Sequence, residues 1–323
     1  MNYKIIYYAP RFYGYDTEIQ RKIVECGCHV YRVDHSRSRL LNFLLSFLSL
    51  KYREKLFSTN LLTSFMKVPV EQCDLLFVIK GEYLQKNHID YLKSRNNHLK
   101  LIMYQLDSID YFDYRHFISI FDKVITFDFK DAKAYQLEYM PLFYLDDIFP
   151  MADIKEDIDL LFVATNAPWR YNYLQNLKRL SEKYGLTLYI GLKTPVSSFI
   201  KDTMTRKKYY SFKDIRFSTI KRTELISLYR RSKVFVDITN PRQTGLSMRI
   251  IEGYGMNKKL ITSNPNLPLD EYVKEVAAIN SQASDADILD FIKQPIKVYD
   301  NRQSLSINSW LKSLFDIKIY EES

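Results

Sequence analysis

The chain has 323 residues, of which 46% are hydrophobic, and a formal net charge of +9 at neutral pH. This length suits two domains of about 150 residues each, and the apolar fraction is ample for two cores. The excess of basic residues favours an anionic partner: nucleic acid, an anionic lipid surface or a phosphate-bearing substrate. No uninterrupted apolar stretch reaches the roughly 18 residues of a membrane span, so we expect a soluble or peripheral protein.

The cysteines and histidines show no spacing typical of a metal site. Cys26 and Cys28 lack the second pair that zinc would need, Cys73 stands apart, and the five histidines are scattered. The first apolar run is too short for a signal peptide and instead predicts a β-strand. We therefore expect reduced thiols, a cytoplasmic location, no metal and no cofactor.

In chain order, the first half alternates short β-branched and aromatic runs with helical patterns. We expect strands at 4–9, 29–33, 75–79, 99–105 and 123–127, and helices at 17–25, 86–94 and 131–135. This alternation predicts a Rossmann-like domain with a doubly wound parallel sheet, over residues 1–150. The polar sequence of residues 145–159 is typical of a linker.

The segment 36–57 interrupts this alternation with an apolar helical run. Basic residues bracket it: Arg37, Arg39, Lys51, Arg53 and Lys55. Basic flanks around Leu and Phe suit an anionic membrane surface, where each basic residue contributes about 1 kcal/mol. The alternative is a helix packed on the core with solvated ends.

A second alternation follows the linker and predicts a second Rossmann-like domain, over residues 151–323. We expect strands at 160–164, 187–190, 234–238 and 259–262, and helices at 171–184, 223–232 and 247–253. A last amphipathic helix, 308–315, could pack back on the first domain. The basic, aromatic run 206–210 is either a solvated loop or a contact for a lipid-linked acceptor or a donor phosphate.

Three of the eight glycines lie close together, at Gly245, Gly253 and Gly255. Glycine suits a backbone with positive φ or a close approach. The turn of Gly245 leads from a strand-like run to a helix N-terminus, where N–H groups and the helix dipole favour a diphosphate. Glu252, further along that helix, could accept both hydroxyls of a ribose.

These residues resemble a known family. Gly245-Leu246-Ser247, Glu252-Gly-Tyr-Gly255 and the strand-like run after them are similar to the donor-binding segment of GT-B glycosyltransferases. Gln243 to Arg249 and the region around Gly14 resemble bacterial transferases of capsule, exopolysaccharide and lipopolysaccharide assembly. Segments 77–82, 106–108 and 121–128 occur in similar order in such proteins, so the resemblance spans most of the chain.

The resemblance implies a GT-B fold, with two Rossmann-like domains facing each other across a cleft. It further implies a nucleotide-sugar donor in the second domain and a glycan or lipid-linked acceptor in the first, with Glu252 at the ribose. The predicted donor-site residues are Asn166, Arg170, Arg242, Gln243, Thr244, Gly245, Leu246, Ser247, Arg249 and Glu252.

The chain departs from the family pattern at one position. The large retaining family pairs two glutamates at a fixed spacing, and at that spacing before Glu252 this chain has Thr244. This favours inversion by direct displacement, which needs a base for the acceptor hydroxyl. Candidate bases follow strands of the first domain: Asp16, Glu82 and Asp107. Each could instead be a helix cap or turn residue.

Other functions fit the sequence less well. Asp157-Ile-Asp159 and Asp285-Ala-Asp287 match the Asp-x-Asp motif of metal-dependent transferases, but one lies in the linker and the other starts a helix. Dinucleotide and P-loop motifs are absent from the sequence. The aromatic residues are spread as core residues are, so we expect no nucleic-acid partner. The alternatives are a non-catalytic nucleotide-sugar-binding scaffold and a sugar-nucleotide epimerase of the same fold.

Overall fold

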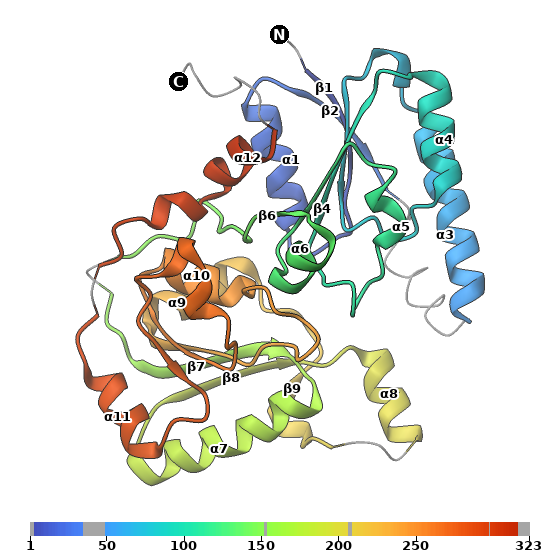
Figure 1. Ribbon diagram of the computed structural model, residues 1–323. Helices are drawn as coiled ribbons and strands as arrows, with labels where there is room; N and C mark the ends of the chain where they lie inside the picture. Colours follow the sequence, from blue (N-terminus) through green and yellow to red (C-terminus); the bar gives the residue numbers. More distant parts are fainter. Residues whose placement is uncertain (1–2, 35–48, 152–153, 206–208, 297, 316–323) are drawn as a thin grey trace. The chain divides into compact units, whose positions relative to one another are not determined.

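The structure is a computed structural model that describes residues 3–34, 49–151, 154–205, 209–296 and 298–315 (Figure 1). The chain forms two compact units. The first contains the residues up to Pro141 and those from Trp310 onward, and the second runs from Leu142 to Ser309. The sequence-based boundary lies later, after residue 150, because the text of 145–159 is polar overall. Leu145 and Ile148 are nevertheless buried, so this stretch packs as part of the second unit.

The first unit is built on a six-stranded parallel sheet of order β2-β1-β3-β4-β5-β6. Its strands are β1 (Lys4–Tyr8), β2 (His29–Val33), β3 (Leu75–Ile79), β4 (Lys100–Gln105), β5 (Lys123–Thr126) and β6 (Glu138–Tyr139). Its helices are α1 (Tyr15–Glu25), α3 (Leu50–Phe65), α4 (Lys86–Arg95), α5 (Arg115–Ile118), α6 (Phe129–Tyr135) and the end of α12 (Ile307–Phe315). Every residue of β3 is buried, as expected of a strand covered on both faces.

Helices cover both faces of this sheet (Figure 1). Leu61 of α3 and Leu92 of α4 belong to the core cluster on one face. On the other face, the ring of Trp310 lies 4.9 Å from that of Tyr104, and Phe315 lies 5.1 Å from Phe77, centroid to centroid. The helix expected at 308–315 is therefore present as α12, and its second half packs on the first unit.

The second unit contains another six-stranded parallel sheet, of order β12-β11-β10-β7-β8-β9. Its strands are β7 (Ile158–Thr165), β8 (Leu188–Lys193), β9 (Ile215–Arg216), β10 (Ser232–Asp237), β11 (Lys259–Thr262) and β12 (Ala278–Asn280). Its helices are α7 (Pro168–Tyr184), α8 (Val196–Met204), α9 (Arg222–Arg231), α10 (Met248–Gly255) and α11 (Asp285–Lys293). Two Rossmann-like sheets in tandem confirm the predicted fold class.

Two of the clustered glycines lie where helix α10 closely approaches its neighbours. A Cβ at Gly255 would come within 2.7 Å of Ile148 and 2.8 Å of the Tyr144 ring, and one at Gly253 within 2.7 Å of a Leu260 methyl group. Neither glycine is among the positive-φ residues. Close packing, rather than a left-handed backbone, explains their presence.

We expect Gly255→Ala to destabilise the protein more than Gly253→Ala. Alanine in a helix gains about 0.5–1 kcal/mol over glycine, but overpacking costs about 1–3 kcal/mol. At Gly255 the clash is with the rigid Tyr144 ring, whereas at Gly253 the end of the flexible Leu260 side chain can move. Thermal and urea unfolding of both variants would measure the order. A Gly255→Ala protein as stable as the unaltered chain would contradict this packing.

The basic segment 36–57 is described only in part. Arg37 and Arg39 lie outside the described residues. From Leu50 onward the segment belongs to α3, whose Phe57 is buried while Lys51 is exposed. The described part of α3 therefore packs on the core. Among the described residues, no helix is both long and apolar enough to cross a membrane.

Candidate functional site

In the second sheet, the strand order reverses between β7 and β10. These two strands are neighbours, while β8 and β9 extend the sheet on one side and β11 and β12 on the other. Ligands of open α/β sheets bind outside the carboxyl ends of the strands at such a reversal. The predicted donor-site residues follow these two strands: Asn166 and Arg170 after β7, and residues 242–252 after β10. The structure thus brings both groups to one edge of the sheet.

Side-chain amides hold the loop after β10 from a neighbouring strand. Asn264, which follows β11, donates from Nδ2 to the carbonyl oxygen of Gly245 at 2.9 Å. Asn266 donates likewise to the carbonyl oxygen of Thr244 at 3.1 Å. Arg242 is the exposed cation of this loop, and its backbone N–H donates to the Asn240 side chain. These bonds give the loop a defined path.

Asp237, the last residue of β10, is a fully buried carboxylate beneath this loop. Its oxygens accept from the hydroxyls of Ser247 at 2.6 Å and Thr239 at 2.7 Å, and Thr262 lies at 3.3 Å. The Arg249 guanidinium lies 3.6 Å away. Asp237 was not predicted as a site residue, because it ends an apolar strand that was expected to be core. A carboxylate at the carboxyl end of such a strand could have indicated it.

Helix α10 begins after Ser247, which caps it. The Ser247 hydroxyl accepts from the N–H of Ile250 and donates to Asp237, so one side chain joins the helix start to the sheet. Arg249, in the first turn, is mostly buried, and its Nε has no hydrogen-bond partner among the described residues. A helix N-terminus with an adjacent guanidinium is attractive to an anion.

Glu252 is almost fully buried, with 3% of its surface exposed. Tyr229 donates to Oε2 at 2.5 Å and Arg222 donates to Oε1 at 2.7 Å. Arg222 also pairs with Asp147 at 2.6 Å. Burial, and then the charge of Glu252, raise the pKa of Tyr229 well above its usual value. A ribose could use only the remaining lone pairs of this carboxylate.

The two predicted residues after β7 differ in their surroundings. Arg170 donates to the carbonyl oxygens of Ile238 at 2.8 Å and Thr165 at 3.1 Å, so it ties together the ends of β10 and β7. Asn166 donates from Nδ2 to Thr194 at 3.0 Å, while its buried Oδ1 has no partner among the described residues. Asn166 thus offers a buried acceptor at the sheet edge.

The first sheet reverses its order between β1 and β3, and two of the predicted bases follow these strands. Asp16 comes after β1 and Glu82 after β3. Residues with positive φ gather in the same loops: Tyr13, Gly14, Lys80, Gly81 and Tyr83. Strained backbone of this kind clusters at functional sites. The edge of the first sheet is therefore a candidate acceptor site.

The three candidate bases are held differently. Asp16 is buried, 3.0 Å from the guanidinium of Arg32, and accepts from the N–H of Phe12. Asp107 lies 3.0 Å from Lys80. Burial lowers the pKa of Lys80, but the negative charges of Asp107 and Glu82 have the larger combined effect and raise it. Glu82 is partly exposed and forms no ion pair among the described residues.

Both Asp-x-Asp motifs are engaged in structural contacts. Asp157 pairs with Arg231 at 2.7 Å, and Asp159 pairs with Lys233 at 2.7 Å. Asp285 starts α11, as expected, after the cap Ser284. Within the described ranges, no group of three or more His, Cys, Asp or Glu could hold a metal ion.

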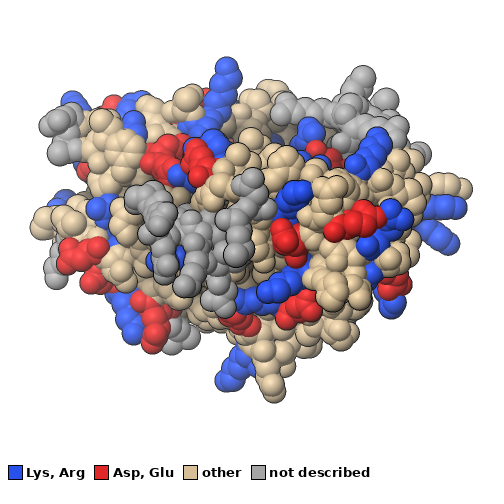
Figure 2. All heavy atoms as spheres, turned by 90° about the horizontal axis from the view of Figure 1, so that it is seen from above, with Lys and Arg blue, Asp and Glu red and all other residues tan. Residues whose placement is uncertain are grey.

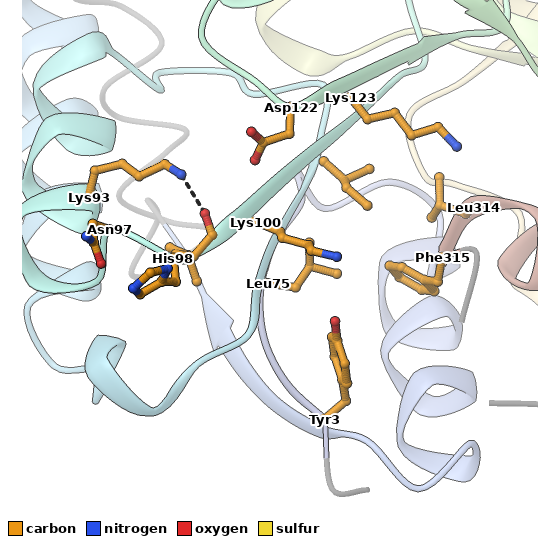
Figure 3. Close-up of a pocket in the computed structure, with 12 residues that line it drawn as sticks. Tyr3, Leu75, Lys93, Asn97, His98, Lys100, Asp122, Lys123, Leu314 and Phe315 are labelled. Carbon is orange, nitrogen blue, oxygen red and sulfur yellow. Dashed lines mark hydrogen bonds between the residues drawn. The ribbon is translucent and has the colours of Figure 1, made fainter. Parts of the chain in front are cut away.

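A cavity of about 590 Å³ opens at the other edge of the first sheet (Figure 3). It is bordered by the first residues of three strands, Leu75, Lys100 and Lys123. Lys93 and His98 add polar groups, and Lys93 is occupied by a hydrogen bond to the carbonyl oxygen of Leu99. Because it lies at the amino ends of the strands, this cavity is separate from the candidate acceptor site.

The positive net charge is not gathered on one broad surface in the view of Figure 2, where basic and acidic side chains are interspersed. Of the described residues predicted to meet a membrane, Lys51 and Lys55 are exposed and Arg53 is half-buried beside Tyr83. Burial raises the pKa of Tyr83, and the positive charge of Arg53 lowers it by a smaller amount. Arg53 thus has a structural contact within the first unit.

Comparison with known proteins places the fold. No family model matches the sequence, and no curated protein matches it. Sucrose-phosphate synthase from Thermosynechococcus elongatus matches with a TM-score of 0.60 and 11% identity, covering 97% of this chain and 98% of that one. UDP-GlcNAc 2-epimerase from Methanocaldococcus jannaschii matches with a TM-score of 0.57 and 13% identity, covering 98% of this chain and 100% of that one.

The lipopolysaccharide outer core galactosyltransferase WaaB, in its apo form, matches with a TM-score of 0.52 and 11% identity, covering 97% of this chain and 99% of that one. Identities this low show the fold and nothing finer. The order of strands in each sheet agrees with that fold. The chain therefore has the GT-B fold of two Rossmann-like units.

Proposed function

We propose that the protein is a glycosyltransferase that moves a sugar from a nucleotide-sugar to a glycan or lipid-linked acceptor, in the assembly of a bacterial surface polysaccharide. One observation carries the proposal: the loops after β7 and β10 gather polar groups at the strand-order reversal of the second sheet, beside the N-terminus of α10. The resemblance of the 243–255 segment to donor-binding segments and the glycosyltransferases among the structures of the same fold support it. On this proposal the enzyme works at the cytoplasmic face of the cell membrane.

The donor diphosphate would lie at the N-terminus of α10. Arg242 and Arg249 supply positive charge, and backbone N–H groups of the first turn supply donors. The free acceptor on Asn166 suits a hydroxyl or ring N–H of the nucleoside. Glu252 remains our candidate for the ribose, beside the bonds that its carboxylate accepts from Tyr229 and Arg222.

The reaction we propose is a direct displacement with inversion. The acceptor hydroxyl loses its proton to a carboxylate, and its oxygen attacks the anomeric carbon. The bond from that carbon to the diphosphate oxygen breaks, and its electron pair leaves with the nucleoside diphosphate. Of the three candidates, Glu82 is best suited as the base, because Asp16 and Asp107 are each neutralised by a cation.

We propose that no metal ion is required, since the helix N-terminus and arginines can balance the charge of the leaving diphosphate. Transfer should therefore survive treatment with a chelator. Loss of transfer in EDTA, restored by Mg²⁺ or Mn²⁺, would overturn this part of the proposal alone.

The proposal is tested by measuring release of the nucleoside diphosphate from a panel of nucleotide-sugars, with and without glycan acceptors. A transferase releases it only when an acceptor is present. The structure of an epimerase among those of the same fold favours one alternative. An epimerase would change or hydrolyse the donor without an acceptor, and a binding scaffold would do neither.

Glu82→Gln should lower kcat by about 10²–10⁴-fold, the usual contribution of a general base. Binding of the donor should not change, because Glu82 lies in the first unit. Glu54→Gln, on the exposed surface of α3, serves as the matched control. Unaltered kcat in Glu82→Gln would remove this residue from the mechanism, and the same measurement on Asp107→Asn would follow.

A further inference from the structure

Helix α8 carries an apolar stripe that is largely exposed. Val196, Phe199, Ile200 and Met204 recur at helical spacing; Phe199 is partly buried against the core of the second unit, while Val196, Ile200 and Met204 are exposed. Met204 is 79% exposed. Figure 1 shows α8 at the end of the second unit where β9 forms the edge of the sheet. A helix of a globular protein ordinarily turns its apolar stripe toward the core, as α8 does at Phe199; the exposed Val196, Ile200 and Met204 indicate an external partner.

Aromatic rings from the next segment extend the stripe. The ring of Phe199 lies 5.1 Å from Phe217 and 6.1 Å from Phe212, centroid to centroid. Phe212 is 61% exposed and Phe217 is 37% exposed. Together these side chains form one surface, the α8 patch, made of Val196, Phe199, Ile200, Met204, Phe212 and Phe217.

Exposed cations flank the α8 patch. Lys201 and Lys213 are both exposed. The two acidic residues nearby turn to other partners: Asp202 accepts from the Tyr210 hydroxyl, and Asp214 is buried against Lys178 and Tyr171. Of the basic run predicted at 206–210, residues 206–208 lie outside the described residues.

We propose that the α8 patch binds the surface of an anionic lipid bilayer. Phe, Ile and Met suit the boundary between headgroups and acyl chains, and lysines beside them suit lipid phosphates. The flanking lysines favour a bilayer over a protein partner, because they match the negative charge of the lipid phosphates. The inference rests on the proposed function, which puts the enzyme at the cell membrane, and it names the surface that binds the bilayer.

The inference differs from the membrane contact predicted for 36–57. The described part of that segment has Phe57 in the core, whereas no residue of α8 is buried. The bilayer-binding surface therefore belongs to the second unit.

The test is sedimentation of the full chain with vesicles of phosphatidylcholine alone or with added phosphatidylglycerol. We expect binding to the anionic vesicles. Met204→Asp and Phe212→Ser should each lower the partition coefficient at least tenfold, and the Lys201→Glu/Lys213→Glu pair should lower it only on anionic vesicles. Met66→Asp, at an exposed methionine that follows α3, is the matched control and should bind as the unaltered chain does.

Three outcomes would overturn the inference: no binding of the unaltered chain to anionic vesicles, variants that bind equally well, or an equal loss in Met66→Asp. A change of oligomeric state without vesicles, with vesicle binding retained, would assign the α8 patch to a second copy of the chain. Thermal unfolding of each variant shows that it is folded. Transfer to a soluble acceptor should be unaffected by these changes, which separates failure here from failure of the proposed function.

Discussion

Asp237→Ala is expected to lower the free energy of unfolding by about 3–5 kcal/mol, the usual cost of removing one member of a buried charged network. The change leaves the hydroxyls of Ser247 and Thr239 without their acceptor and removes the carboxylate 3.6 Å from Arg249. Binding of a nucleotide-sugar should fall as well, because Ser247 joins the start of α10 to the sheet through Asp237. Urea unfolding and a donor titration measure the two effects.

Two milder variants show whether Asp237 acts through these contacts. Ser247→Ala removes one of them together with the helix cap, so we expect a loss of about 1 kcal/mol. Asp237→Asn keeps the shape of the side chain but leaves one amide N–H₂ facing hydroxyl groups. Its loss of stability should lie between those of Ser247→Ala and Asp237→Ala. If Asp237→Ala proves as stable as Ser247→Ala, the carboxylate does not organise the loop.

Many strands and helices could be predicted from the local pattern of apolar and polar residues. The elements that were not predicted have physical reasons. The strand at 75–79 is a continuous apolar run, so its position was predicted without error. The two-residue strands β6 and β9 are too short to carry any periodicity. Helix α8 was also missed: no element was predicted between 190 and 223, although the apolar stripe of this helix is regular.

The candidate site was predictable in position but not in its internal contacts. Glycine, serine and arginine after an apolar strand indicate where a phosphate can bind, because that pattern is local. The partners of Glu252 are not local: Arg222 and Tyr229 come from α9, which precedes it in the chain. Only the packing of α9 beside α10 shows that this carboxylate is already engaged.

These contacts change what a substitution of Glu252 can show. Glu252→Ala is expected to cost about 1–3 kcal/mol of stability, because the buried hydroxyl of Tyr229 loses its acceptor. Glu252→Gln keeps an acceptor for that hydroxyl and should be closer in stability to the unaltered chain. Weak donor binding in Glu252→Ala alone would therefore report disorder of α10 as readily as a lost ribose contact.

A double-mutant cycle separates the two causes. Tyr229→Phe removes the hydroxyl, so Glu252→Ala should cost less stability in the Tyr229→Phe background than in the unaltered chain. A ribose contact, in contrast, is lost with Glu252 in either background. Weak donor binding that persists in the Glu252→Ala/Tyr229→Phe protein, and in the stable Glu252→Gln, would support the ribose assignment. Normal affinity in both would mean that Glu252 serves only to bind α9 to α10.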